Sequence, residues 1–118
     1  MRYDDLEGLL PLPPATFHIL VALSDADRHG YGIMQEVAQR TGGKTKLNPG
    51  TLYTTIQRLL DKGLIVELHE RRDPEDDDER RRYYRLTPAG RRAARLDLAR
   101  LTEMVTLGRR AGLARERG

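Results

Sequence analysis

The sequence has no cysteine, no tryptophan and only one phenylalanine among its 118 residues. Without cysteine the chain cannot form disulfide bonds or thiol nucleophiles, which agrees with a cytoplasmic protein. No apolar run approaches 18 residues, and the N-terminal MRYDDLEGLLPLPP lacks the basic start and apolar core of a secretory signal. We therefore expect neither a membrane span nor secretion.

Catalytic and metal-binding patterns are also missing. The sequence contains no Gly-x-Ser-x-Gly and no His-x-x-x-His, and the histidines at 18, 29 and 69 are too dispersed for a metal site. The acidic run Asp73–Glu79 lacks the spacing of a calcium loop. The glycines around Tyr31 do not follow a strand and no Walker lysine comes after them. We expect no enzymatic activity, no metal and no cofactor, and interpret His18 as a partly buried packing residue.

The proportion of charged residues limits how large the core can be and which kinds of partner the protein can bind. Charged residues make up 33% of the chain against 38% apolar residues, so we expect one domain with a small core. Residues 1–70 carry seven Lys/Arg and nine Asp/Glu, whereas residues 71–118 carry fourteen and nine. The net charge of +3 permits nucleic-acid binding without requiring it.

The segment 48–62 has the pattern of an amphipathic helix. Asn48 suits its N-cap, Pro49 its first position and Gly63 its end. Its apolar face comprises Leu52, Ile56, Leu59 and Leu60. The opposite face is polar, with no acid before Asp61. Such a face suits the edges of DNA bases, although most amphipathic helices have a polar face that is merely solvated.

Two shorter helices are predicted before this segment. Residues 1–11 form a loose N-terminal arm, with apolar residues able to pack as a short helical turn. A helix over 14–23 starts at its prolines, and a second over 30–41 stops at the Gly42-Gly43 pair. The first is expected to bury Phe17, Leu20, Val21 and Leu23, and residues 24–29 form a polar loop. Three such helices make a helix-turn-helix arrangement.

Two β-prone runs, 64–70 and 82–87, predict a hairpin with a long tip, which is a wing. Its inward face is expected to comprise Leu64, Val66, Leu68, Tyr84 and Leu86. The tip Asp73–Glu79 has six acids in seven residues, which a phosphate backbone would repel. We therefore expect the arginines of the hairpin stems to make the DNA contacts.

The final helix begins at Thr87-Pro88 and is predicted to run to Gly108 or Gly112. It has two apolar stripes. The first comprises Ala89, Ala93, Leu96, Met104 and Leu107, and the second comprises Ala94, Leu98, Leu101 and Val105 at 4-3-4 spacing. The first covers its own domain, and the second would stay exposed in a monomer. The second stripe therefore predicts a dimer. The alternative is that both stripes are buried in the core of a single subunit.

Several motifs together resemble one known family. They are His29-Gly-Tyr-Gly-Ile33, Gly50-Thr-Leu-Tyr53, Leu59 with Gly63-Leu-Ile65, and Arg82-Tyr-Tyr-Arg-Leu-Thr-Pro-Ala-Gly90. In this order and spacing, over roughly residues 10 to 110, the chain resembles the PadR family of winged-helix transcriptional regulators, in its shorter subfamily with one C-terminal helix. The predicted fold is mainly α with a small β-hairpin (α+β), a winged helix-turn-helix plus a C-terminal dimerisation helix. The expected divisions are an arm (1–11), a DNA-binding domain (12–87), a dimerisation helix (88–113) and a disordered tail (114–118).

The resemblance implies a homodimer, usually a repressor, that binds a pseudo-palindromic operator and in many members is released by a small molecule near the dimer interface. It places the start of the recognition helix at Gly50, Thr51, Tyr53 and Thr54. The predicted DNA-binding residues are Tyr31, Lys44, Lys46, Asn48, Gly50, Thr51, Tyr53, Thr54, Gln57, Arg58, Arg71, Arg72, Arg80, Arg81 and Arg82. The predicted dimer interface comprises Leu9, Leu10, Ala94, Leu98, Leu101 and Val105.

Two points stay open at this stage. A winged helix can also dock another protein without binding DNA, and the acidic wing tip favours that alternative. An effector pocket is expected between the C-terminal helix, the first helix and the partner subunit. Phe17 is the one aromatic residue expected there. The chain has no tryptophan, so an effector that binds by stacking on tryptophan is not supported.

Overall fold

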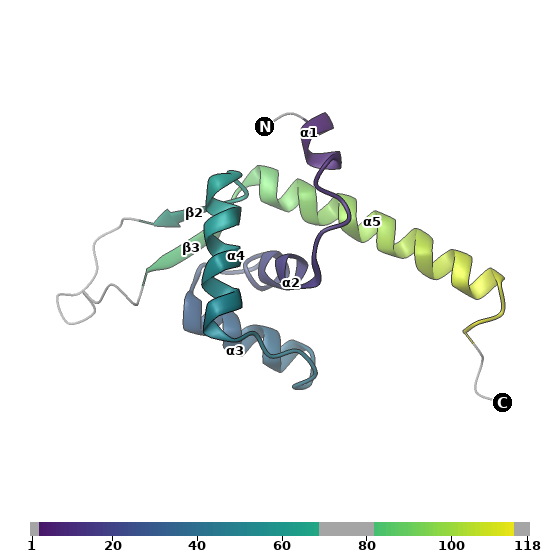
Figure 1. The fold of residues 1–118 in the computed structure, drawn as a ribbon, viewed down its shortest axis with the longest axis horizontal. Coiled ribbons are helices and arrows are strands. Elements are labelled where there is room, and N and C mark those ends of the chain that lie inside the picture. The colour runs from purple at the N-terminus through teal and green to yellow at the C-terminus, as the bar shows by residue number, and fades with distance from the viewer. Residues whose placement is uncertain (1–2, 69–81, 115–118) are drawn as a thin grey trace.

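The computed structural model describes residues 3–68 and 82–114, which form a mainly helical fold with one small sheet (Figure 1). In chain order the elements are α1 (Tyr3–Glu7), α2 (Pro14–Ala22), β1 (Arg28–His29), α3 (Gly30–Arg40), α4 (Pro49–Asp61), β2 (Ile65–Leu68), β3 (Tyr83–Leu86) and α5 (Pro88–Arg110). The predicted fold class, a winged helix-turn-helix with a long C-terminal helix, is confirmed. The wing tip and the last residues of the predicted tail, 115–118, lie outside the described residues.

Helix α2 is at the centre of the core and packs against α3, α4 and α5. Because it has neighbours on several sides, it has no single buried stripe. The prediction for this helix was therefore partly wrong. Ile19 and Ala22 are buried with Leu20 and Leu23, whereas Phe17 and Val21 are only half-buried. The other main core residues are Ile33, Val37, Leu52, Ile56, Leu59, Leu64 and Ile65.

Side-chain caps fix where α4 and α5 begin, as predicted. Asn48 Oδ1 accepts a hydrogen bond from the Thr51 N–H at 2.8 Å. Thr87 Oγ1 accepts one from the Gly90 N–H at 3.0 Å and donates to the Gly63 carbonyl at 2.7 Å. Each cap satisfies an N–H that the first helical turn leaves without an intrahelical partner. The Thr87 bond also holds the start of α5 against the turn that ends α4.

The sheet has three antiparallel strands in the order β1-β3-β2, so the prediction that residues 24–29 are only a polar loop was wrong. Arg28 pairs with Tyr84 and His29 with Tyr83. The prediction for the inward face of the wing was partly wrong: Leu64 and Tyr84 are buried as predicted, but Val66 is not. Ile65 pairs with Leu86 and is buried, whereas its neighbour Val66 points outward and is exposed.

The first residues are not a loose arm. Leu6 of α1 is completely buried, and α1 packs against α5. After it, the Leu12 N–H donates to Oδ1 of Asp97 on α5 at 3.3 Å, and Arg100 Nε donates to the same oxygen at 2.8 Å. Asp97 is only 1% exposed. A buried carboxylate is stable only when it is paired in this way, so this cluster fixes the N-terminal segment to α5.

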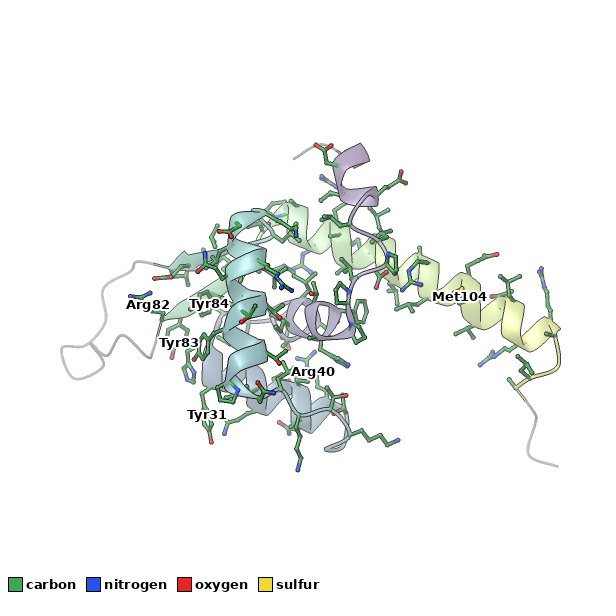
Figure 2. The ribbon with its side chains drawn as sticks, in the orientation of Figure 1. Tyr31, Arg40, Arg82, Tyr83, Tyr84 and Met104 are labelled. Carbon is green, nitrogen blue, oxygen red and sulfur yellow. The ribbon has the colours of Figure 1, made fainter. Side chains whose placement is uncertain are left out.

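Helix α5 extends beyond the rest of the fold, and Figure 2 shows Met104 on the extended part. Its first stripe covers the domain only near the N-terminal end, where Ala93 is buried. The prediction that the whole stripe is covered was wrong, since Met104 and Leu107 are 57% and 51% exposed. None of the helices in the described part of the chain is long and apolar enough to cross a membrane.

Candidate nucleic-acid interface

The polar face of α4 is at the surface, and only its two flanks meet other elements: Tyr53 lies over Gly30 of α3, and Arg58 lies beside the segment between α1 and α2. All of the residues predicted for this face are exposed: Asn48, Gly50, Thr51, Tyr53, Thr54, Gln57 and Arg58. At about 3.6 residues per turn, Gly50, Thr54 and Gln57 lie at its centre. Tyr53 lies on one flank and Arg58 on the other. The face offers hydroxyl, amide and cationic groups, which are the groups that bind base edges and phosphates.

Two side-chain hydrogen bonds order this face. Asn48 uses its side-chain oxygen for the helix cap, so that oxygen is not available to DNA while the cap is intact. Gln57 Nε2 donates to Asp61 Oδ1 at 3.0 Å. Only the amide nitrogen can donate to a carboxylate, so this bond leaves the amide oxygen of Gln57 as a free acceptor.

The Tyr53 flank continues into an aromatic group from three elements. Tyr31 of α3 is 59% exposed, and His29 meets Tyr83 of β3 edge-on, with ring centroids 5.2 Å apart. Figure 2 shows Tyr31, Tyr83 and Tyr84 on the same side of the domain. Burial raises the pKa of Tyr84, and the nearby Glu67 and Tyr53 raise it further, so this phenol stays protonated at neutral pH. No local pattern in the sequence marks Tyr83, because only the pairing of β1 with β3 brings it beside His29.

Tyr53 is seated over Gly30, the first residue of α3. A Cβ atom at position 30 would overlap the Tyr53 hydroxyl and lie 2.8 Å from Cζ of the ring. His29 caps the same helix, since its Nδ1 accepts from the Gly32 N–H at 3.0 Å. The absence of a side chain at Gly30 therefore sets the position of Tyr53.

We expect Gly30→Ala to weaken duplex binding about ten-fold while the protein stays folded. The added methyl group must displace the Tyr53 ring, and half-exposed aromatic rings can move at a modest cost. Duplex titrations and circular dichroism would measure the two effects. Gly32→Ala is the comparison on the same helix, because its new Cβ would lie 3.4 Å from His29 Cε1, which is an ordinary contact, and should leave Tyr53 in place. Unchanged affinity for Gly30→Ala would show that the position of Tyr53 does not matter.

Behind α3, ion pairs fix the helix to the corner between α2 and β1. Arg28 Nε donates to the Ala22 carbonyl at 2.7 Å, and Arg40 contacts Asp25 at 3.0 Å and Glu36 at 2.5 Å. The hydrogen bond to Glu36, with the charge of Asp25, raises the pKa of Arg40 despite partial desolvation. Desolvation would raise the pKa of Asp25, but the hydrogen bonds and charges of Arg28 and Arg40 outweigh it and lower that pKa. Arg28 and Arg40 are thus engaged within the fold.

The remaining predicted cations fall into three groups. Lys44 and Lys46 are exposed in the loop before α4. Arg82 is exposed directly before β3, with its Nε 3.6 Å from Glu67 Oε2. Four arginines lie outside the described residues: Arg71, Arg72, Arg80 and Arg81. Figure 2 shows Tyr31 and Arg82 on the same side of the domain, and the other stem arginines stay predictions.

A second surface is on α5. Leu98 and Val105 are 55% and 52% exposed, while Leu101 and Ala94 are half-buried.

Beside Leu98, a cavity of about 150 Å³ lies between α2, β3 and α5, where the effector pocket was expected. Phe17 lines it, and Arg91 and Arg95 are among its polar residues. Leu9 and Leu10 pack at the edge of the chain's own core and are half-buried.

Residues 19–96 match the family model described as the transcriptional regulator PadR-like family. The chain is also 40% identical over 87 residues to the transcriptional regulator Rv3488 of Mycobacterium tuberculosis, covering 74% of this chain and 75% of that protein. The chain belongs to the PadR-like family. The match includes α3, α4 and both described wing strands, and it ends within the first half of α5. A PadR-like regulator is a transcription factor and not an enzyme.

Solved structures of PadR-like and related regulators share the fold. A transcriptional regulator from Clostridium thermocellum superposes with a TM-score of 0.68 at 23% identity, covering 93% of this chain and 96% of that one. Bacillus subtilis PadR, solved in complex with operator DNA, gives a TM-score of 0.63 at 20% identity, covering 75% of this chain and 48% of that chain. At these identities the likeness concerns the fold.

Proposed function

We propose that this PadR-like protein is a sequence-specific DNA-binding regulator whose helix α4 enters the major groove. The observation that carries the proposal is the exposed face of α4, which has hydroxyl and amide groups at its centre and Arg58 on its flank. The centre of the face, at Gly50, Thr54 and Gln57, is exposed, so it can enter a groove without any rearrangement of the fold. Bacillus subtilis PadR, which shares the fold, was solved on operator DNA.

The proposal divides the chain into parts with separate tasks. Residues 12–87 bind DNA through α4, Tyr31, the lysines before α4 and the wing stems. Helix α5, within residues 88–113, pairs with a second copy through Leu98, Leu101 and Val105, flanked by Ala94 and the N-terminal Leu9 and Leu10. A two-fold dimer presents two copies of α4, which fits a pseudo-palindromic operator. The protein acts as a repressor by occupying such a site.

A small-molecule effector would bind in the cavity between α2, β3 and α5. At about 150 Å³, this cavity is small compared with most ligand sites, which occupy roughly 300–1,000 Å³. Leu98 belongs both to the cavity wall and to the exposed stripe, so the partner subunit would enlarge and close the site. A ligand there would alter the packing of α5 on α2 and so the spacing of the two α4 helices.

The test of the DNA-reading face is a pair of substitutions, Thr54→Ala and Arg58→Ala. Each removes exposed groups without disturbing the core, so we expect duplex affinity to fall about ten-fold or more while folding and dimerisation persist. Wild-type binding should also weaken steeply as salt rises, because each phosphate contact releases counterions. If both variants bind as tightly as wild type, α4 does not read DNA. A wild-type protein without duplex affinity at low salt would favour the alternative, a winged-helix module that docks another protein.

A further inference from the structure

A groove runs beside α4 on the flank opposite to Tyr53. It lies between α4 and the segment that joins α1 to α2, and has a volume of about 270 Å³. Its floor is apolar and includes Leu9, Leu12 and Leu59, and its polar groups come from Thr16, Arg58 and Lys62. We call it the α4 flank groove.

Two positive charges stand on one side of this groove. Arg58 and Lys62 are four residues apart, so they are neighbours on consecutive turns of the helix. Both are exposed, and neither forms an ion pair with any residue in 3–68 or 82–114. The nearest acid in sequence, Asp61, accepts a hydrogen bond from Gln57 at the centre of the polar face. The groove is therefore a cationic site without an internal anion.

Helix α5 holds one wall of the α4 flank groove in place. The Leu12 N–H donates to the buried carboxylate of Asp97, so the segment that forms one wall is anchored to α5. Leu12 itself is 7% exposed. The apolar floor keeps water away on one side of the two cations, which strengthens their attraction for an anion. A preformed cationic site binds an anion without first ordering its wall.

The position of the groove indicates which anion it binds. A helix in the major groove has a sugar–phosphate strand along each of its flanks. With α4 in the groove, the Tyr53 flank and Tyr31 would meet one strand. The α4 flank groove lies on the opposite flank, where the other strand would run. We infer that the α4 flank groove binds a backbone phosphate of the second strand through Lys62 and Arg58, with the Thr16 hydroxyl as a further donor.

This inference rests on the proposed function and adds Lys62 and Thr16 to the DNA-contacting residues. It also assigns them a role that differs from that of Thr54 and Gln57. Phosphate contacts hold the protein on any sequence, whereas contacts to base edges discriminate between sequences. Loss of the groove contacts should therefore weaken specific and random duplexes by the same factor.

The experiment measures the salt dependence of duplex binding for wild type, Lys62→Gln and Lys62→Arg, on an operator duplex selected from a random pool and on an unrelated duplex. Each lost contact lowers the slope of log affinity against log salt by about 0.9, so a dimer with two grooves should lose about 2. At roughly 0.1 M salt this corresponds to about ten-fold in affinity for each contact. Lys62→Arg keeps the charge and should retain the wild-type slope. Thr16→Val, which keeps the shape of the side chain, should weaken both duplexes with little change in slope.

Arg92→Ala on the exposed side of α5 is the matched control for charge, and its slope should equal that of wild type. If Lys62→Gln keeps the wild-type slope while Thr54→Ala weakens binding, the groove takes no phosphate and the proposed function stands. A loss confined to the operator duplex would also overturn the inference, because it would mean base recognition. If wild type binds neither duplex at low salt, the proposed function fails, and the inference fails with it.

Discussion

Replacing Val105 by aspartate is expected to convert the protein into a folded monomer and to abolish tight operator binding. Val105 is 52% exposed on α5, so an aspartate there has no unfavourable neighbour in the monomer. In the proposed dimer the same carboxylate would enter an apolar seam, and two-fold symmetry would place two of them there. Burying unpaired carboxylates costs several kcal/mol each, so the dimer dissociation constant should rise about a thousand-fold or more.

Sedimentation equilibrium and duplex titration would measure the two consequences. Ala99→Asp is the matched control, because Ala99 is exposed on the opposite side of α5, between Leu98 and Arg100 in sequence. It adds the same charge to the same helix and should leave both the dimer and DNA binding intact. If Val105→Asp stays dimeric, the seam lies elsewhere. If it becomes monomeric but binds the operator as tightly as before, binding does not need the dimer.

Gly90→Ala is expected to destabilise the fold more than any other single methyl addition considered for this protein. Gly90 lies where α5 crosses the turn between α4 and β2, and a Cβ atom there would overlap the Leu64 carbonyl oxygen. It would also lie 2.8 Å from Leu86 Cδ1 and 3.0 Å from the Leu64 carbonyl carbon. Backbone atoms cannot move aside as a side chain can, so α5 must shift. Overpacking of this kind costs about 3 kcal/mol, which lowers Tm by roughly 10 °C or more.

Gly108→Ala adds the same methyl group to α5 at a position where there is space for it, and should stabilise the helix. No atom lies within 4 Å of a Cβ at that position, and the residue is helical. The substitution should raise Tm slightly, since alanine favours a helix over glycine by up to about 1 kcal/mol. Thermal unfolding of both variants at one protein concentration would compare them, because the proposed dimerisation would make Tm concentration-dependent. A Gly90→Ala protein as stable as wild type would mean that α5 does not pack closely on the turn.

The elements predicted correctly from the sequence were those with local signals. Asn48 and Pro49 define the start of α4 within one turn, and Thr87 does the same for α5, so their caps and starts were predicted to the residue. The polar face of α4 followed from its helical period. These features depend on residues close together in the chain, which a sequence shows directly.

The errors concern contacts between distant residues. The two-residue strand β1 exists because β3 pairs with it, and no local pattern marks it. Val66 was placed inward because the alternation was counted from Leu64, which precedes β2 and is buried in the turn. The groove beside α4 was missed for a similar reason. Lys62, on one wall of the groove, was interpreted only as the end of a helix. The other wall of the groove comes from residues near Leu12, which are distant in sequence.

The hydrogen bond between Leu12 and Asp97 also bears on the order of folding. It joins residues 85 apart, whereas most contacts among α2, α3 and α4 join residues much closer in sequence. Long-range contacts carry a larger loop-closure entropy and form late in folding. During synthesis, residues 14–61 emerge well before Asp97, so the helical core can assemble before α5, the main partner of α1, is complete. We expect α1 to dock last, and amide hydrogen exchange should show its protection appearing after that of α2 and α4.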